Sequence, residues 1–453
     1  MGGLSRRTTI IEQKKAEGKP FVMVDAGNFS TPNLQIKEDE KFQFRLKSQL
    51  MMETFVMNGV QALGLGQKDF VLGSEWLFQE LQKNALPFVV SNLECEGVDI
   101  PKVQKVIVEG VSFQFYSLLT EKAKVDGCTV IPPLEAWNEL KKEPLGDINV
   151  LFSHLTSTEL ETGFLDFDII LETATGKRLD TPESLDEDTV LIGSGSKGKV
   201  IGWAQLNLHP MHKGFRASNA GASLDLDLER WEKKIAALHE EIKEKPTEES
   251  RLDRQIKYYS DRKAELEKKK AILSSNAKTH NILNGLIPLE KTVEDHPKIA
   301  EKLLETLEKI EAATKEQEVA TYTGDYVGSH RCFGCHPAQT EQWKTTRHSH
   351  AWESLIKEKR SSDLQCFACH STGSLKEGGP VHPTQVVTHQ LQNVGCEACH
   401  GAGIEHVKTP SKTNISKHVD VNVCTECHDG KNDQGRFDQE KYWPRIVHES
   451  SGN

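Results

Sequence analysis

The chain has 453 residues, a hydrophobic content of 37%, a charged content of 27% and a formal net charge of −11. This length predicts two or three domains, and the charge balance gives no sign of nucleic-acid binding. No run of eighteen or more apolar residues occurs, which excludes a transmembrane helix within this sequence.

Residues 19–220 show the pattern of alternating helices and strands. Short apolar runs typical of buried strands lie at 21–24, 86–90, 106–108, 150–152 and 169–171, and helical stretches lie at 44–62 and 74–84. The pattern predicts a mixed α/β domain in which helices pack against a sheet. Cys95 and Cys128 in this region either form a structural disulfide or remain as two free core thiols.

Several short segments of this region carry a family resemblance. Residues 2–7, 24–29, 64–70, 153–155 and 281–289 are similar to motifs of the 5′-nucleotidases, within the calcineurin-like metallophosphoesterases. The resemblance covers residues 1–220 and 281–318. It implies a sheet sandwich flanked by helices, with two metal ions held by Asp, Asn and His side chains to activate water against a phosphoester.

Most of the metal ligands of that family are missing here. The family's opening Asp-x-His motif would lie before residue 1, and His154 matches a retained ligand. The other ligand positions are occupied by residues of different chemistry, namely Asn28, Gln67, Lys68, Thr173 and Thr175. One retained ligand cannot hold a dinuclear site, so the resemblance implies the fold without the activity.

Residues 224–275 have a different pattern. Apolar residues alternate spacings of four and three from Leu224 to Ile242, and again from Leu252 to Leu273 after Pro246. This rhythm predicts an antiparallel helical hairpin, which serves either as a spacer or lid or as a partner-binding coiled coil. The hairpin also permits a homo-oligomer or filament. Residues 276–318 return to mixed sequence and end in a helix at about 294–316.

The last third of the chain contains four CxxCH motifs, which are the attachment signature of c-type haem. Each Cys pair can form two thioethers with the haem, and the adjacent His can bind the iron. Zinc knuckles also use paired cysteines, but a zinc site does not require His directly after the second Cys. The predicted thioether residues are Cys332, Cys335, Cys366, Cys369, Cys396, Cys399, Cys424 and Cys427, and the predicted proximal ligands are His336, His370, His400 and His428.

Eight other histidines lie in the same segment, which contains no Met. His/Met ligation is therefore excluded within the segment, and bis-His ligation is expected to hold the reduction potentials low. The segment has little periodic apolar patterning, so we expect it to take much of its core from the porphyrins and to be largely unfolded without them.

The motifs and their surroundings resemble a known family. Residues 328–332, 342–343, 347–348, 353–355, 394–401 and 424–428 are similar to the small tetrahaem cytochromes typified by the electron acceptor of hydroxylamine oxidoreductase. The resemblance covers residues 326–453 and implies three bis-His haems and one haem with an open distal face.

The resemblance also implies which histidines are the distal ligands. His348 is similar to the distal ligand of the fourth haem, His406 to that of the first and His448 to that of the third. The second haem is the open one in that family, but His382 and His389 lie nearby in this sequence, and either could close the site.

Together these patterns predict a multidomain α+β protein. The predicted domains are a metallophosphoesterase-like domain at 1–222, the hairpin at 223–278, a closing segment and linker helix at 279–320, and a mainly helical and irregular tetrahaem domain at 321–453. The favoured function is electron transfer through four haem c groups to redox partner proteins. The alternative is a haem enzyme that converts a small nitrogen or oxygen species.

Haem attachment also predicts the location of the protein. Cytochrome c maturation takes place outside the bacterial cytoplasm, so we expect a periplasmic or extracellular protein. The first seven residues lack the apolar core of a signal peptide, and we therefore expect the export signal to be missing from this chain.

Overall fold

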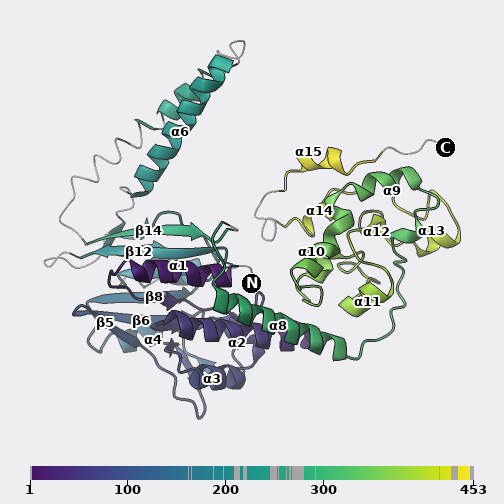
Figure 1. Cartoon of the computed structure of the whole chain (residues 1–453). Coiled ribbons are helices and arrows are strands. Elements are labelled where there is room, and N and C mark those ends of the chain that lie inside the picture. The colour runs from purple at the N-terminus through teal and green to yellow at the C-terminus, as the bar shows by residue number, and fades with distance from the viewer. Residues whose placement is uncertain are drawn as a thin grey trace. The chain divides into compact units, whose positions relative to one another are not determined.

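A computed structural model of the chain describes residues 3–161, 163–164, 166–186, 188–196, 198–208, 215–217, 222–244, 252–253, 255–261, 263–264, 267, 280–290, 292–417, 419–429 and 437–448. The chain divides into two compact units, Met1–Ala300 and Glu301–Asn453 (Figure 1). The predicted fold class is confirmed, because the first unit is mixed α/β and the second is built from short helices and irregular chain. Across the described residues, no helix has both the length and the apolar character needed to cross a membrane.

The helices of the first unit follow the predicted pattern with one correction. The predicted helix 44–62 ends early, because Gly59 adopts a left-handed conformation (φ 69°) directly after Asn58, and the chain then enters a strand. The described helices of this unit are α1 (Leu4–Ala16), α2 (Lys41–Asn58), α3 (Ser74–Lys83), α4 (Pro133–Leu140), α5 (Ser157–Glu161) and α6 (Ala222–Glu244), with 3-10 turns at Glu38–Glu40 and Gln67–Leu72.

The main sheet of the first unit has six strands in the order β10-β11-β9-β8-β6-β5. Its four central strands are parallel to one another, and the two edge strands, β10 and β5, are antiparallel to their neighbours. The strands are β5 (Gln104–Val108), β6 (Val111–Leu119), β8 (Ile148–His154), β9 (Ile169–Glu172), β10 (Glu183–Ser184) and β11 (Val190–Ile192).

Three smaller sheets complete the first unit. A parallel sheet contains β1 (Val24–Asp25), β2 (Ala62–Gly64) and β3 (Phe88–Val89). A second contains β12 (Val200–Asn207), β14 (His280–Pro288) and β13 (Phe215–Ala217), and a two-stranded sheet contains β4 (Leu93–Cys95) and β7 (Cys128–Val130).

Strand β8 explains why the main sheet is covered on both faces. All seven of its residues are buried. Val150 and Phe152 pack into one apolar cluster, and Leu151 packs into another that includes Trp137 of α4. Because neighbouring side chains on a strand point to opposite faces, these two clusters lie on the two faces of the sheet. The continuous apolar run at 150–152 in the sequence is therefore a doubly buried strand.

The described parts of the predicted hairpin contact one another. The ring of Trp231 in α6 stacks on that of Tyr259, with ring centroids 5.1 Å apart. Glu232 of α6 forms an ion pair of 2.7 Å with Lys263. Residues 255–261 and 263–264 are helical, so the second segment returns along α6 as the heptad-like spacing predicts. The predicted domain limits at 222 and 278 remain a prediction.

The second unit has short helices and a small apolar core. Its core contains seven buried side chains, among them Tyr326, Trp352 and Val386. The helix α8 (Pro297–Glu316) spans the point at which the chain divides. The other helices are α9 (Pro337–Lys344), α10 (Ala351–Lys357), α11 (Pro383–Thr388), α12 (Cys396–His400), α13 (Ile404–Lys408), α14 (Asn422–Thr425) and α15 (Gln439–Tyr442).

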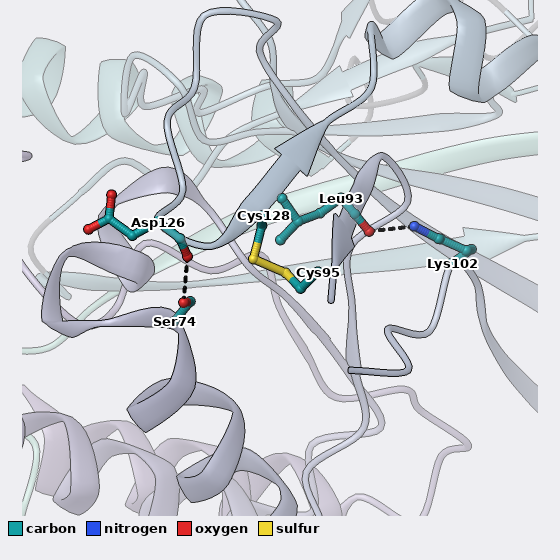
Figure 2. The surroundings of a disulfide bond; sticks show 6 residues. All are labelled: Ser74, Leu93, Cys95, Lys102, Asp126 and Cys128. Carbon is teal, nitrogen blue, oxygen red and sulfur yellow. Dashed lines mark hydrogen bonds between the residues drawn. A yellow bond between two sulfur atoms is a disulfide. The ribbon is translucent and has the colours of Figure 1, made fainter. Parts of the chain in front are cut away.

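Cys95 and Cys128 form a disulfide between β4 and β7, which settles the two alternatives left open by the sequence (Figure 2). The two residues are directly opposite each other in the antiparallel pair. Hydrogen bonds flank the bridge, from Ser74 Oγ to the Asp126 carbonyl oxygen at 2.7 Å and from Lys102 Nζ to the Leu93 carbonyl oxygen at 2.5 Å. The disulfide closes a loop across a sequence separation of 33 residues.

Replacing both cysteines by serine is expected to lower the free energy of unfolding of the first unit. Loop-closure entropy for a loop of this length gives a loss of about 3–4 kcal/mol. Denaturant unfolding followed by far-ultraviolet circular dichroism would measure the loss. The wild-type protein treated with a thiol reductant should match the double variant, and the double variant should not respond to the reductant. Equal stability of the oxidised wild type and the double variant would contradict the prediction.

Candidate haem-binding sites

Each CxxCH motif forms a tight helical turn. In the first and fourth motifs, the backbone N–H of the histidine donates to the carbonyl oxygen of the first cysteine, at 3.0 Å for His336 and 2.9 Å for His428. The second motif lies in the 3-10 turn Phe367–His370, and the third forms α12. This turn brings the two thiols and the imidazole to one side of the chain, as attachment to a single porphyrin requires. None of the eight motif cysteines is part of a disulfide, and Cys335 is the exposed one.

Three motif histidines face a second histidine from a distant part of the chain. The ring centroids are 6.3 Å apart for His336 and His406, and 6.4 Å apart for His348 and His428. For His400 and His448 the distance is 5.7 Å. These are the three pairs that the family resemblance implied.

The ring separations leave room for a metal ion. Two imidazole–metal bonds of about 2 Å, with roughly 1.1 Å from each bonding nitrogen to its ring centre, span about 6 Å. The residues present therefore fit an iron atom between each pair of rings.

Hydrogen bonds at Nδ1 orient several of these rings. His370 donates to the Ala351 carbonyl oxygen at 2.7 Å, and His400 donates to the Ser416 carbonyl oxygen at 2.7 Å. Nδ1 of His406 lies 3.0 Å from the Ser411 carbonyl oxygen. A bond of this kind fixes the tautomer and leaves Nε2 as the metal-binding nitrogen.

The second motif differs from the other three. Within the described part of the chain, the ring of His370 has no facing histidine ring like the three pairs above. A hollow of about 420 Å³ lies beside it. The residues that line this hollow are Thr345, Thr346, Arg347, His350, Ala351, Ser354 and His370.

The structure does not bring the predicted ligands His382 and His389 to a motif histidine. His382 is buried at the start of α11, where Nδ1 accepts from the Thr384 backbone N–H at 3.2 Å and Nε2 lies 3.0 Å from Oε1 of Gln317. Both ring nitrogens of His382 are therefore engaged. The ring of His389 packs edge-on against Tyr322, with centroids 5.0 Å apart. Both residues stabilise the local fold.

Contacts between cysteines show which motifs are neighbours. A hydrogen bond joins the thiols of Cys332 and Cys396, which raises the pKa of Cys332 and lowers that of Cys396 to about 7. A second such bond joins Cys427 and Cys369 and lowers the pKa of Cys369 to about 7. The first motif thus lies against the third, and the second lies against the fourth.

The third and fourth motifs are also close to each other. Burial is the main cause that raises the pKa of Cys399 to about 11, and the charge of Cys424 adds to it. The charge of Cys399 in turn contributes to raising the pKa of Cys427. Cysteines of the third motif therefore lie near cysteines of the fourth.

In the first unit, hydrogen bonds surround His154, the residue that the sequence resemblance matched to a retained metal ligand. Nδ1 of His154 lies 3.2 Å from Asn28 Nδ2 and 2.7 Å from Thr173 Oγ1. Asn28 and Thr173 are two of the residues that the sequence comparison found in place of the family's metal ligands. Among the described residues, no group of three or more His, Cys, Asp or Glu side chains is arranged to hold a metal ion.

Asp69 fixes the backbone on which Asn28 stands. Its buried carboxylate accepts backbone N–H groups of Asn28 (2.6 Å), Phe29 (2.7 Å), Ser30 (3.0 Å) and Gly66 (2.8 Å). Burial raises the pKa of Asp69 to about 6, against the effect of these hydrogen bonds. Burial lowers the pKa of His154 to about 4, opposed by a hydrogen bond to the backbone of Ala26.

Comparison with known proteins identifies part of the second unit. Residues 331–401 match the protein-family model described as Cytochrome c554 and c-prime. The second unit thus contains a segment that is similar to cytochrome c554. Cytochrome c-554 of Nitrosomonas europaea is 31% identical over 136 residues, covering 23% of this chain and 57% of the relative. The chain thus spans a little over half the length of that relative, and the family predicted for this segment is confirmed.

Two solved structures are similar over a larger part of the chain. The sulfate thiohydrolase of Thermus thermophilus has a TM-score of 0.46 and 13% identity, covering 75% of this chain and 54% of its own. A 5′-nucleotidase precursor from Thermus thermophilus has a TM-score of 0.47 and 14% identity, covering 73% of this chain and 57% of its own. A 5′-nucleotidase is thus among the proteins to which this chain is similar.

The sequence did not place any residue beside the second motif histidine other than His382 and His389. Arg347, His350 and Ser354 line the hollow beside His370. His350 and Ser354 are four residues apart at the start of α10, a spacing that places two side chains on one helix face. That spacing was the available signal, but a single sequence does not show that His370 packs against this face.

The two buried groups of the first unit predict an effect of pH on stability. The folded state holds His154 neutral down to a pKa of about 4, whereas unfolded His takes a proton near 6.5, so this group loses stability as pH falls from 6.5 to 4. Folded Asp69 takes a proton near pH 6, before unfolded Asp does near 3.8, so it gains stability over nearly the same range. The two contributions oppose each other.

The substitution His154→Gln removes the acid destabilisation that His154 causes and keeps the stabilisation that Asp69 provides. Compared with the wild type, the variant should gain roughly 3 kcal/mol in unfolding free energy on going from pH 7 to pH 4. Denaturant midpoints measured across this range would test it. His239→Gln, which removes an exposed histidine of α6, should follow the wild-type curve. Parallel curves for His154→Gln and the wild type would contradict the assignment.

Proposed function

We propose that this chain is a tetrahaem c-type cytochrome that carries electrons, attached to a phosphoesterase-like unit that serves as a catalytically inactive scaffold. The observation that carries the proposal is the set of three facing histidine pairs, each of which joins one CxxCH histidine to a second histidine. Two axial histidines saturate the iron and suit a haem to electron transfer.

Each motif has a defined part in this proposal. The cysteine pairs would hold four haem c groups by thioether bonds, and the groups would supply one-electron transfer when bound. His336, His400 and His428 would be proximal ligands with His406, His448 and His348 as the distal ligands. His370 would be the proximal ligand of a haem whose distal side has no histidine. The neighbouring thiols support an electron path in the order first, third, fourth and second motif.

The small core of the second unit supports the same proposal. Seven buried apolar side chains form its core, whereas the first unit has three separate buried clusters. A unit of this size needs more apolar burial to be stable. We infer that the porphyrins supply it, so that haem attachment and folding are coupled.

The proposed location is the periplasm or the extracellular space. The disulfide Cys95–Cys128 supports an oxidising compartment. Attachment of haem to the CxxCH motifs supports the same compartment. The proposed partners are redox proteins that exchange electrons with the haems. A homo-oligomer or filament formed through the helical hairpin stays a prediction.

A second candidate function is a haem enzyme acting on a small nitrogen or oxygen species. The observation in its favour is the hollow of about 420 Å³ beside His370, the one motif histidine without a facing ring in the described chain. Arg347, whose guanidinium group carries several N–H donors, also lines this hollow and could donate hydrogen bonds to a polar ligand there. A ferric high-spin signal that responds to nitric oxide or cyanide would favour this candidate.

The fully oxidised holoprotein should contain four haems per chain, three low-spin and one high-spin. Low-temperature electron paramagnetic resonance with a chemical haem count on the same sample would test this. His448→Ala should convert a second haem to high-spin because it removes the ring that faces His400. His389→Ala should leave the spectrum unchanged. Four low-spin haems in the wild type would instead mean that another histidine binds the iron at His370.

The scaffold role of the first unit gives a separate prediction. Purified protein supplied with Mn²⁺, Zn²⁺ or Ca²⁺ should release no phosphate from nucleotides, because Asn28 and Thr173 replace ligand side chains with groups that hydrogen-bond to His154. A colorimetric phosphate assay would measure this. Metal-dependent release that is lost in His154→Gln would show an active site and overturn the scaffold role.

A further inference from the structure

Glu397 follows the first cysteine of the third motif, and its carboxylate is buried. Its exposed fraction is 2%. Oε1 accepts the backbone N–H of Gly403 at 2.7 Å, and Oε2 accepts that of Gly328 at 2.7 Å. The backbone N–H of Val327 lies 3.0 and 3.2 Å from the two oxygens. Every partner is a donor, as an ionised carboxylate requires.

No positive side chain neutralises this carboxylate. In the described chain, Glu397 forms no ion pair with a Lys, Arg or His within 4.0 Å. The titratable groups that interact with it include Tyr322, Tyr326, Cys332 and Cys396, none of which can carry a positive charge. Backbone N–H groups satisfy hydrogen bonds but carry no net charge. A whole negative charge therefore lies inside the second unit, where water screens it little.

The charge of Glu397 acts on two motifs at once. It adds to the causes that raise the pKa of Cys332 in the first motif, after the hydrogen bond to Cys396 and burial. In the third motif, it opposes the lowering of the pKa of Cys396 that the hydrogen bond from Cys332 produces. The hydrogen bonds to Val327 and Gly328 tie the chain that leads into the first motif to the third.

We propose that Glu397 is a positioning residue that lowers the reduction potentials of the haems at the first and third motifs. The inference rests on the proposed function, because it requires haems at Cys332–Cys335 and Cys396–Cys399. Ferric iron carries one more positive charge than ferrous iron. A fixed negative charge nearby therefore stabilises the ferric state. It also repels the electron that reduces the iron, so the reduction potential falls.

The fourth motif supplies a natural comparison. Glu426 also lies between two motif cysteines, but its side chain is 37% exposed and forms an ion pair with Lys376. Exposed pairs of this kind are screened by water and salt. The charge of Glu426 is thus compensated, and that of Glu397 is not. Glu397 would therefore bias electrons away from the first and third motifs and toward the second and fourth.

The test is a redox titration of the full-length holoprotein, followed by absorption and by electron paramagnetic resonance to separate the haems. Glu397→Gln should shift the ferric-to-ferrous ratio of two haems at least tenfold toward ferrous at a fixed potential, which is about 59 mV for a one-electron couple. Glu426→Gln, the matched control, should leave all four curves in place. Glu397→Asp keeps the charge and should stay close to the wild type.

The outcomes separate this inference from the proposed function. A wild type without four haems or without reversible reduction would overturn the proposed function. Four reversible haems with unchanged potentials in Glu397→Gln would overturn only the role of Glu397. So would an equal shift in Glu397→Asp, since it would show that packing and not charge is responsible.

A measurement on the wild type covers the case in which Glu397→Gln does not mature. Raising the salt concentration should leave the potentials of the two lower haems unchanged, because the buried charge is shielded from ions. A large rise of those potentials with salt would show that surface charges set them, and would overturn the inference.

Discussion

The second unit brings together pairs of histidines that are far apart in the chain. His336 faces His406, His348 faces His428 and His400 faces His448. With a metal bound, each pair would be a cross-link that shortens the loops of the unfolded chain. With such cross-links, short helices and a core of seven residues would be enough to keep the unit folded.

A hydrogen-bonded segment before the third motif holds these histidines in place. The Trp343 indole N–H donates to the Val394 carbonyl oxygen at 3.0 Å, and the Cys396 N–H donates to Ser329 Oγ at 3.0 Å. The buried carboxylate of Glu397 continues this network to Gly328 and Gly403. One segment thus aligns the first motif with the third and carries the charge proposed to set their potentials. Position and electrostatics are set by the same residues.

The sequence predicted local features well and distant contacts only in part. The CxxCH turns and the strand at 150–152 follow from short patterns, since spacing and apolar runs are local. Gly59 ended α2 before the predicted limit, because a left-handed glycine cap is hard to tell from an isolated helical glycine. His382 was predicted as a ligand, yet it caps α11. Glu397 gave no signal, since acidic residues are rarely buried and nothing local reveals its three N–H donors.

The two units achieve stability by different physical means. In the first unit, Asn28 and Thr173 hydrogen-bond to His154, and Asp69 binds four backbone N–H groups around the same point. Hydrogen bonds thus surround His154 at the place where the sequence resemblance implied metal ligands. Nε2 of His154 is an exception, since it is buried with no hydrogen-bond partner among the described residues, and the three apolar clusters provide the main burial of the unit. In the second unit, by contrast, the proposed haems would add apolar burial to a core of seven side chains.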